Sequence, residues 1–292
     1  MALSKIRLFL AMIKFEHTIF ALPYAYIGMI MASFYKDGTW PGWRTFFWVT
    51  LAMVGARSAA MALNRLIDRQ IDAKNPRTAD RELPKGAITS FETLLFIIAS
   101  LVLLGISAWM LNPLCFYLMP LAVFFLVVYS YTKRFTWACH LVLGITDGLA
   151  PLGAWIAVTG KFDLPGLLLA GAVAAWIAAF DIIYACQDVE FDRREGLYSI
   201  PARFGIAEGL WISRALDVLT IVLFLLIPLY VSLGPIYYVG VVVVAALLVY
   251  EHLIISPNDM SRIDIAFFKV NSIIATVAFL FTFTDIGLRL WR

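Results

Sequence analysis

Two groups of polar side chains recur at helical spacing in a chain whose residues are 62% hydrophobic. Asn64, Asp68 and Asp72 lie four residues apart, so on a helix they form a stripe along one face. A second stripe at positions i, i+3, i+7 and i+11 consists of Asp181, Tyr184, Asp188 and Asp192. Carboxylate oxygens suit Mg²⁺, which proteins usually hold with a few carboxylates together with the phosphates of a substrate. The spacing therefore predicts a metal–diphosphate site, provided that the two stripes meet.

Basic side chains follow both stripes closely and would take the remaining phosphate charge through charge-assisted hydrogen bonds. Charges at the end of an apolar helix can also mark no more than the membrane boundary. Here two stripes follow apolar segments that run in the same direction, so both lie on the same side of the membrane. A membrane boundary alone is therefore the less favoured interpretation. The spacing alone does not indicate what the diphosphate carries.

The elements that must position these stripes are long apolar segments. Nine of them are long enough to cross about 30 Å of hydrocarbon: near 18–34, 44–63, 91–111, 115–131, 138–159, 166–186, 210–232, 235–255 and 266–286. Without period-two alternation they are expected to be helices, since lipid admits only helices and closed barrels. The sequence predicts an all-α, polytopic membrane protein, a bundle of nine transmembrane helices forming one domain over residues 1–292. A short helix in the membrane interface is expected before the first segment.

The basic residues predict the orientation of the chain in the membrane. With the N-terminus in the cytoplasm, 17 of the 23 lysines and arginines fall on the cytoplasmic side and five on the other. Both acidic stripes then lie on the cytoplasmic side of the cell's inner (plasma) membrane. The formal net charge of +3 gives no indication of a nucleic-acid partner.

A few isolated polar residues lie within the apolar segments. Arg57 falls on nearly the same helix face as Asn64 and is predicted to bind the donor's diphosphate or an acceptor's carboxylate, with an internal salt bridge as the alternative. Asp147 is expected either to hydrogen-bond an acceptor hydroxyl or to pair with Arg57 or with a helix backbone. Structural hydrogen bonding is expected for His17, His140 and His252, and interhelical bonding for Asn271. The cysteines, Cys115, Cys139 and Cys186, are expected to be buried free thiols.

The whole chain resembles the UbiA-type membrane prenyltransferases. The pattern N-x-x-x-D-x-x-x-D with R-T-x-x-R-x-L-P-x-G, from Asn64 to Gly86, is similar to their first aspartate-rich motif. The pattern D-x-x-Y-x-x-x-D-x-x-x-D with S-x-P-x-R-F-G, from Asp181 to Gly205, is similar to their second. VYSYTKR, with Tyr129 and Lys133, resembles a third family feature.

The resemblance implies an aromatic polyprenyltransferase that uses Mg²⁺ and a polyprenyl diphosphate donor in the lipid bilayer. Catalytic and metal-binding roles are implied for Asp68, Asp72, Asp188 and Asp192, and a catalytic role is predicted for Arg57. Roles in substrate binding are predicted for Asn64, Arg77, Arg81, Tyr129, Lys133, Arg134, Asp181, Tyr184 and Arg203. The loop from Asn75 to Gly86 is expected to cap the bound donor.

Three functions remain open at this point. The closest similarity is to the 4-hydroxybenzoate polyprenyltransferase branch of ubiquinone biosynthesis, with a small aromatic acid as acceptor. That branch includes enzymes of menaquinone biosynthesis that prenylate a dihydroxynaphthoate. A transporter is the non-enzyme alternative, because intramembrane Arg and Asp also mark ion pathways.

Overall fold

The structure is a computed structural model that describes residues 2–14 and 18–290. Within these ranges all regular structure is helical, apart from an isolated bridge between Ser256 and Asp259. The α-helices are α1 (Ala2–Met12), α2 (Thr18–Asp37), α3 (Trp43–Lys74), α4 (Ser90–Leu111), α5 (Pro113–Thr132), α6 (Cys139–Thr159), α7 (Leu164–Ala185), α8 (Val189–Glu195), α9 (Ile200–Phe204), α10 (Ile206–Leu226), α11 (Pro235–Leu253) and α12 (Asn271–Leu290). Two 3₁₀ turns, η2 (Cys186–Asp188) and η3 (Ile227–Leu229), and a π-helix, η4 (Ile265–Val270), connect or extend them.

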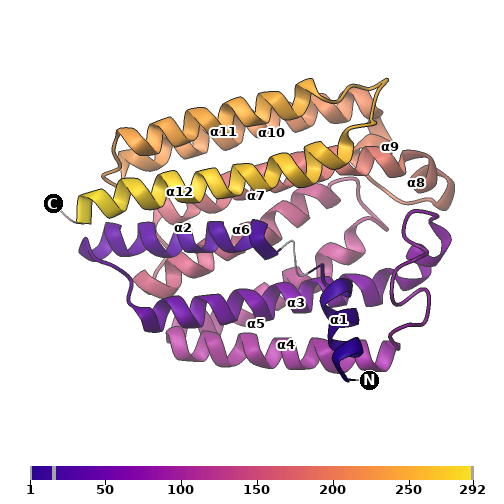
Figure 1. The fold of residues 1–292 in the computed structure, drawn as a ribbon, viewed down its shortest axis with the longest axis horizontal. Coiled ribbons are helices and arrows are strands. Elements are labelled where there is room, and N and C mark those ends of the chain that lie inside the picture. Colours follow the sequence, from indigo (N-terminus) through magenta and orange to yellow (C-terminus); the bar gives the residue numbers. More distant parts are fainter. Residues whose placement is uncertain (1, 15–17, 291–292) are drawn as a thin grey trace.

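The long helices run side by side in one bundle (Figure 1). In the described part of the chain, eight helices are long and apolar enough to cross a membrane. The remaining predicted segment corresponds to α2, a helix of 20 residues that contains Pro23 and runs along the same bundle. The all-α, multi-pass membrane class predicted from the sequence is confirmed, with eight helices rather than nine meeting these limits of length and apolarity.

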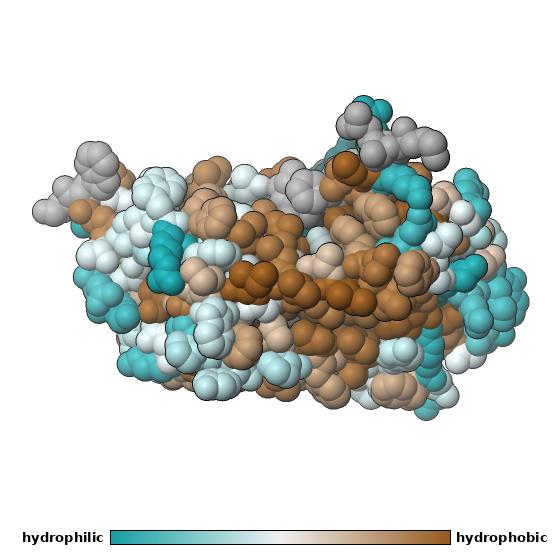
Figure 2. Space-filling model, turned by 90° about the horizontal axis from the view of Figure 1, so that it is seen from below, coloured by the Kyte–Doolittle hydropathy of each residue, from teal (hydrophilic) through white to brown (hydrophobic). Residues whose placement is uncertain are grey.

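The outer surface of the bundle is apolar where lipid would lie. On the face shown in Figure 2, hydrophobic residues occupy a broad central region and hydrophilic residues gather towards both ends. Large side chains such as Trp109 of α4 and Tyr117 of α5 are exposed. Exposed apolar surface of this extent is expected for a protein solvated by hydrocarbon, where it carries no hydrophobic penalty.

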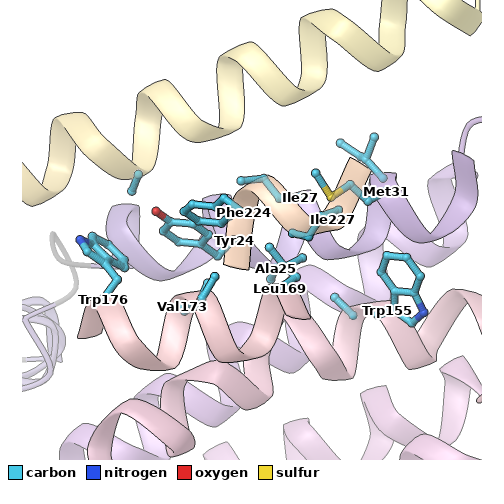
Figure 3. Packing of buried hydrophobic residues seen from close by; sticks show 14 of the residues in the cluster. Tyr24, Ala25, Ile27, Met31, Trp155, Leu169, Val173, Trp176, Phe224 and Ile227 are labelled. Carbon is cyan, nitrogen blue, oxygen red and sulfur yellow. The ribbon is translucent and has the colours of Figure 1, made fainter. Parts of the chain in front are cut away.

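The interior of the bundle is held by large aromatic side chains and by close helix contacts. Tyr24, Trp155 and Trp176 are fully buried and pack among aliphatic residues of α2, α7 and α10 (Figure 3). A Cβ at Gly28 would collide with the backbone of Pro151, so α2 and α6 approach to backbone contact there. Small residues at such crossings are typical of helix packing in membranes, where close van der Waals contact replaces the hydrophobic effect.

Both acidic stripes lie at one end of the bundle. The N-terminal helix α1, the segment after α3, and α8 and α9 gather there, while the last helix ends at the opposite end (Figure 1). α1 lies across the bundle and buries Met12 and Ile13, which cluster with Leu83 and Ile88 from the segment after α3. The predicted helix before the first segment is therefore present, and its outer side exposes Ile6 and Leu10.

The two stripes differ in their backbone. α3 is uninterrupted for 32 residues, so Asn64, Asp68 and Asp72 lie on one helix as predicted. The second stripe was expected on one continuous helix, and that expectation is wrong. η2 tightens the chain between α7 and α8, so the helical register changes between Tyr184 and Asp192.

Candidate active site

One cavity of about 610 Å³ lies between the two stripes and extends into the apolar part of the bundle. Its walls come mainly from α3, α5, α6 and α7, with η4 closing one side. Of the 14 predicted site residues, 12 line this cavity: Arg57, Asn64, Asp68, Asp72, Arg77, Arg81, Tyr129, Lys133, Asp181, Tyr184, Asp188 and Asp192. The structure thus brings both stripes to one cavity, which their spacing alone could not establish.

Asp68 is the most densely bonded carboxylate of the first stripe and is only 2% exposed. Lys133 Nζ donates to its Oδ2 at 2.6 Å, and Arg134 donates to its Oδ1 at 2.9 Å. The Asn64 amide donates to the same Oδ2 at 3.1 Å. Two cations and an amide therefore hold this buried carboxylate in one position, which offsets the cost of removing its charge from water.

Asp72, one turn further along α3, is held in a similar way. Arg81 NH1 lies 2.8 Å from both of its carboxylate oxygens. The hydroxyl of Thr78 donates to the backbone carbonyl of Asp72 at 2.9 Å. These contacts fold the segment after α3 back over the end of its own helix.

Asp188 of the second stripe receives its partners from that same segment. Arg77 donates to both carboxylate oxygens, at 3.1 and 2.5 Å, and also to the hydroxyl of Tyr184 at 2.9 Å. The Asn75 amide adds a bond of 3.0 Å to Asp188. Burial by itself would lower the pKa of Arg77, but the hydrogen bonds and charge of Asp188 outweigh it and raise that pKa. Arg77 therefore stays charged and ties the two stripes together.

The remaining acidic residues of the second stripe bond to the segment after α8. Ser199 donates to Asp192 at 3.0 Å. His140 Nδ1 lies 2.6 Å from Asp181, and its Nε2 accepts the backbone N–H of Ile200 at 3.2 Å. Because Nε2 is an acceptor, Nδ1 carries the proton and donates it to Asp181. His140 is therefore a structural hydrogen bonder, as expected, and it joins Asp181 to the start of α9.

Arg57 lies deeper, where the cavity becomes apolar. Its Nε is buried and has no hydrogen-bond partner among the described residues. Asp147 lines the cavity too, but no ion pair joins it to Arg57 in the described part of the chain. The salt-bridge alternative is therefore not what the structure has, and a buried guanidinium nitrogen remains available to an anionic ligand. Tyr129 lines the cavity and donates to the Ala60 carbonyl at 3.1 Å.

Two predicted site residues do not line the cavity. Arg134 lies behind Asp68 and also donates to the carbonyls of Ser130 and Ile67. Arg203 is exposed on the short helix α9, away from the cavity wall. The structure places Arg134 as a support for a carboxylate and does not bring Arg203 to the site.

Several cavity residues were not predicted from the sequence. Lys14 and the buried Arg65 add positive charge at the polar end, and Asn75 supplies the amide bonded to Asp188. Lys14 and Arg65 do not share the periodicity of the stripes, and Asn75, although three residues after Asp72, was assigned to the loop after the helix. An aromatic wall lies on the side of α7 and η4, and of its members only Tyr184 was predicted; the others are Tyr24, Trp176, Phe180, Phe267 and Phe268.

The other residues noted in the sequence have mixed outcomes. Cys186 is buried, whereas Cys115 and Cys139 are only partly buried, so the expectation of three buried thiols is wrong for two of them. All three are free. His252 bonds to Asp217 at 2.8 Å, away from the cavity, while His17 lies outside the described residues.

The donor set at the polar end fits magnesium held together with a diphosphate. Among the described residues, no three His, Cys, Asp or Glu side chains are grouped closely enough to hold an ion by themselves. Magnesium does not need such a cage, because one or two carboxylates together with substrate phosphates and water usually bind it. Hard carboxylate oxygens on both walls, with Arg and Lys between them, are the groups that this kind of site uses.

The comparisons with known proteins agree with this arrangement. Residues 22–273 match the UbiA prenyltransferase family. A 4-hydroxybenzoate octaprenyltransferase of Vibrio campbellii (strain ATCC BAA-1116) is 32% identical over 238 residues, covering 79% of this chain and 81% of that protein. The apo structure of a UbiA homolog from Aeropyrum pernix K1 is 32% identical, with a TM-score of 0.83, and covers 92% of this chain and 98% of its own.

A more distant structure shows the same fold. A UbiA homolog from Archaeoglobus fulgidus bound to GPP and Mg²⁺ is 22% identical, with a TM-score of 0.66, over 96% of this chain and 99% of its own. The class defined by the fold and the cavity is that of membrane-embedded enzymes. The chain belongs to the UbiA prenyltransferase family, and it is a prenyltransferase rather than a transporter.

Proposed function

We propose that this enzyme transfers a polyprenyl group from a polyprenyl diphosphate to a hydroxylated aromatic carboxylate of the 4-hydroxybenzoate kind, in quinone biosynthesis. The observation that carries the proposal is a single cavity with two acidic stripes at its polar end and apolar helix surface beyond them. One end suits a metal-bound diphosphate and the other suits a hydrocarbon chain. The names of the relatives support the choice of acceptor.

The donor's diphosphate binds at the polar end, where Asp68, Asp72, Asp188 and Asp192 would hold Mg²⁺ in this proposal. Magnesium, when bound there, would neutralise the negative charge that develops on the leaving diphosphate. Arg77, Arg81 and Lys133 provide further positive charge for the phosphate oxygens. Preorganised charges of this kind are usually the largest contribution to catalysis.

The acceptor binds deeper, beside Arg57 and Asp147. A carboxylate there would give the unpartnered Arg57 Nε an acceptor, and the Asp147 carboxylate would receive a hydrogen bond from the acceptor's hydroxyl. The carbon next to that hydroxyl bonds to the allylic cation that remains when the diphosphate departs, and then loses its proton. Rejection of acceptors that lack either group is expected, because a buried polar group is costly to leave unpaired.

The prenyl chain leaves the cavity towards lipid. Leu118, Leu121 and Ala122 of α5 line the cavity, and Leu121 is at the same time 51% exposed on the outer surface. A residue that belongs to both surfaces supports an opening beside α5. A CH₂ group is more stable out of water by about 0.8 kcal/mol, in protein and in lipid alike, so units beyond the opening can stay in the bilayer without a cost to binding. The enzyme should therefore tolerate donors of different length.

We further propose that the polar end faces the cytoplasm at the inner (plasma) membrane. Seventeen of the 23 basic residues belong to the end or the connections that this orientation places in the cytoplasm. The two acidic stripes and the N-terminal helix lie together at that end of the bundle (Figure 1).

The experiment that tests the proposal is a product assay with purified enzyme in lipid bilayers. 4-Hydroxybenzoate and a dihydroxynaphthoate are compared as acceptors, each with geranyl, farnesyl and longer diphosphates. We expect prenylated 4-hydroxybenzoate with every donor length. Faster transfer to the dihydroxynaphthoate would assign the enzyme to menaquinone biosynthesis instead. A sharp cutoff in donor length would contradict the opening to lipid.

A further inference from the structure

A buried polar network adjoins the aromatic wall, outside the two acidic stripes, and its members Trp176 and Asn271 also line the cavity. It joins Glu251 near the end of α11, Asn271 at the start of α12 and Trp176 of α7. The Asn271 amide nitrogen donates to Glu251 Oε1 at 2.8 Å, and Asn271 Oδ1 accepts from Trp176 Nε1 at 2.8 Å. Glu251 and Asn271 are only 1% and 2% exposed. A carboxyl group, an amide and an indole N–H are thus buried together where three helices meet.

The position of Asn271 in the chain connects this network to the π-helix η4. Asn271 directly follows the π-helix η4, and its amide nitrogen also donates to the carbonyls of Ala266 and Phe267, at 3.1 and 3.2 Å. One side-chain NH₂ therefore serves three acceptors, the shortest bond being to Glu251. Short π-helical segments change which way the following side chains point, and they are common at functional sites. The side chain of Asn271 fixes the backbone of this one.

The π-helix presents Phe267 and Phe268 to the cavity. Phe267 stacks on Tyr184 with a centroid distance of 4.0 Å, and it meets Phe180 edge to face at 5.3 Å. Tyr184 in turn carries the Arg77 guanidinium 5.0 Å from its ring centre. The network therefore adjoins the part of the aromatic wall nearest to the predicted diphosphate position.

We propose that Asn271, held by Glu251, is a positioning residue that keeps Phe267 and Tyr184 against the allylic end of the donor. The inference rests on the proposed prenyl transfer. When the carbon–oxygen bond of the donor breaks, its electron pair leaves with the diphosphate and an allylic cation remains. That cation either bonds to the acceptor's ring carbon, which then loses a proton, or is captured by water, which gives a prenyl alcohol and a proton. Aromatic rings at this place attract the cation and exclude water.

The measurement is the partition between prenyl alcohol and prenylated acceptor, counted against the total diphosphate released. Asn271→Leu and Glu251→Leu keep similar volumes but remove the amide–carboxyl bond. We expect each to raise the alcohol fraction about tenfold, within the range that cation–aromatic contacts supply. Glu251→Gln retains an acceptor for the Asn271 amide and should restore the partition seen with the unaltered enzyme.

A matched control comes from the other buried pair at this side of the bundle. Asp217 bonds to His252 between α10 and α11, and neither residue lines the cavity. Asp217→Asn should lower the melting temperature and leave the partition unchanged. If Asp217→Asn and Glu251→Leu shift the partition equally, the effect is general destabilisation and the positioning role is refuted.

Phe267→Leu provides a second test in case the network variants do not fold, because it removes the ring and leaves the network intact. It should raise the alcohol fraction as Asn271→Leu does, and an unchanged fraction in a folded Phe267→Leu enzyme would overturn the inference. The two proposals fail in different ways. If the unaltered enzyme prenylates no aromatic acceptor, the proposed function is wrong. If it prenylates normally and the alcohol fraction is the same in these variants as in the unaltered enzyme, only the positioning role is wrong.

Discussion

The two acidic stripes supply similar carboxylates from helix segments of different rigidity. The first lies on the uninterrupted helix α3, and its Asp68 and Asp72 are almost completely buried. The second crosses the 3₁₀ turn η2, and the side chains of Asp181 and Asp188 are 26% and 17% exposed. Both stripes line the same cavity, but only the first has a rigid backbone beneath it.

The partners of the two stripes differ in the same direction. Asp68 is held by Lys133 and Arg134, which lie in the turn directly after α5. Asp188 is held by Arg77 and Asn75, which belong to the irregular segment after α3. A carboxylate held by cations in the turn directly after a helix keeps its position, whereas one held by the longer irregular segment can move with that segment. Asp72 of the first stripe also bonds to that segment, through Arg81, but its own helix α3 is uninterrupted. We therefore expect the first stripe to be a preformed half of the site and the second to adjust when the donor binds.

The largest expected effect comes from removing a carboxylate from either stripe. Asp68→Asn and Asp188→Asn should each lower kcat by about 10²–10³-fold, because preorganised charge at the leaving group is lost. The same applies to Asp72 and Asp192. Product formation in bilayers measures the effect. Asp80→Asn is the control, since Asp80 is exposed and pairs only with Lys85. Near-normal activity in any two of the four variants would refute the two-stripe site.

A smaller and unequal effect is expected from the cations. Arg77→Gln removes three hydrogen bonds that join Asp188 to Tyr184, and kcat/KM for the donor should fall about 10–100-fold. Arg134→Gln leaves Lys133 on Asp68, so its loss should be only about 2–5-fold. Arg77→Lys keeps the charge but not the planar fork and should lie between them. Equal losses in Arg77→Gln and Arg134→Gln would show that the two stripes are supported alike.

The ion pairs also predict how metal and diphosphate depend on each other. Asp68, Asp72 and Asp188 each carry an internal cation, so Mg²⁺ alone meets positive charge and diphosphate alone meets carboxylates. Bound together, they allow the carboxylates to turn to the metal and the cations to the phosphates. The two ligands should therefore favour each other's binding by about 1–3 kcal/mol.

Thermal unfolding with Mg²⁺ alone, inorganic pyrophosphate alone and both together measures this coupling. The shift with both should exceed the sum of the single shifts, and Asp188→Asn should lose the excess. If the melting-temperature shifts were additive in the unaltered protein, the proposed exchange of ion-pair partners on binding would be refuted.

Much of this arrangement could be predicted from the sequence, for a physical reason. Hydrocarbon imposes long apolar helices, so the spans and the ends that carry charge are visible as composition. The periodicity of a helix then places Asp68 and Asp72 on one face. η2 was missed because CQD contains no Gly or Pro and the acidic spacing continues at helical period through it. Arg65, Asn75 and Asn271 were not predicted as site residues, because their roles depend on which helices pack together. Arg203 fits the motif, yet the fold carries its side chain outward.

The smallest expected effect concerns the segment from Asn75 to Gly86, which was predicted to cap the donor. Its first half holds Arg77 and Arg81 against the carboxylates, so it should tighten when the phosphates bind. Its second half is already anchored, because Leu83 is buried with Met12 of α1 and with Ile13 directly after it. Only a limited motion around Arg77 and Arg81 is therefore available.

Limited digestion with trypsin reports on that motion. The bond after Lys85 is accessible, since the Lys85 side chain is 54% exposed and pairs only with Asp80. With Mg²⁺ and a non-hydrolysable donor analogue, cleavage there should slow by about 2–5-fold, as expected when a ligand reduces local opening. Cleavage after the exposed Arg262, which lies outside the cavity wall, should not change. Equal cleavage rates at Lys85 with and without the analogue would mean that the segment does not move when the donor binds. Any adjustment would then be confined to η2 and the second stripe.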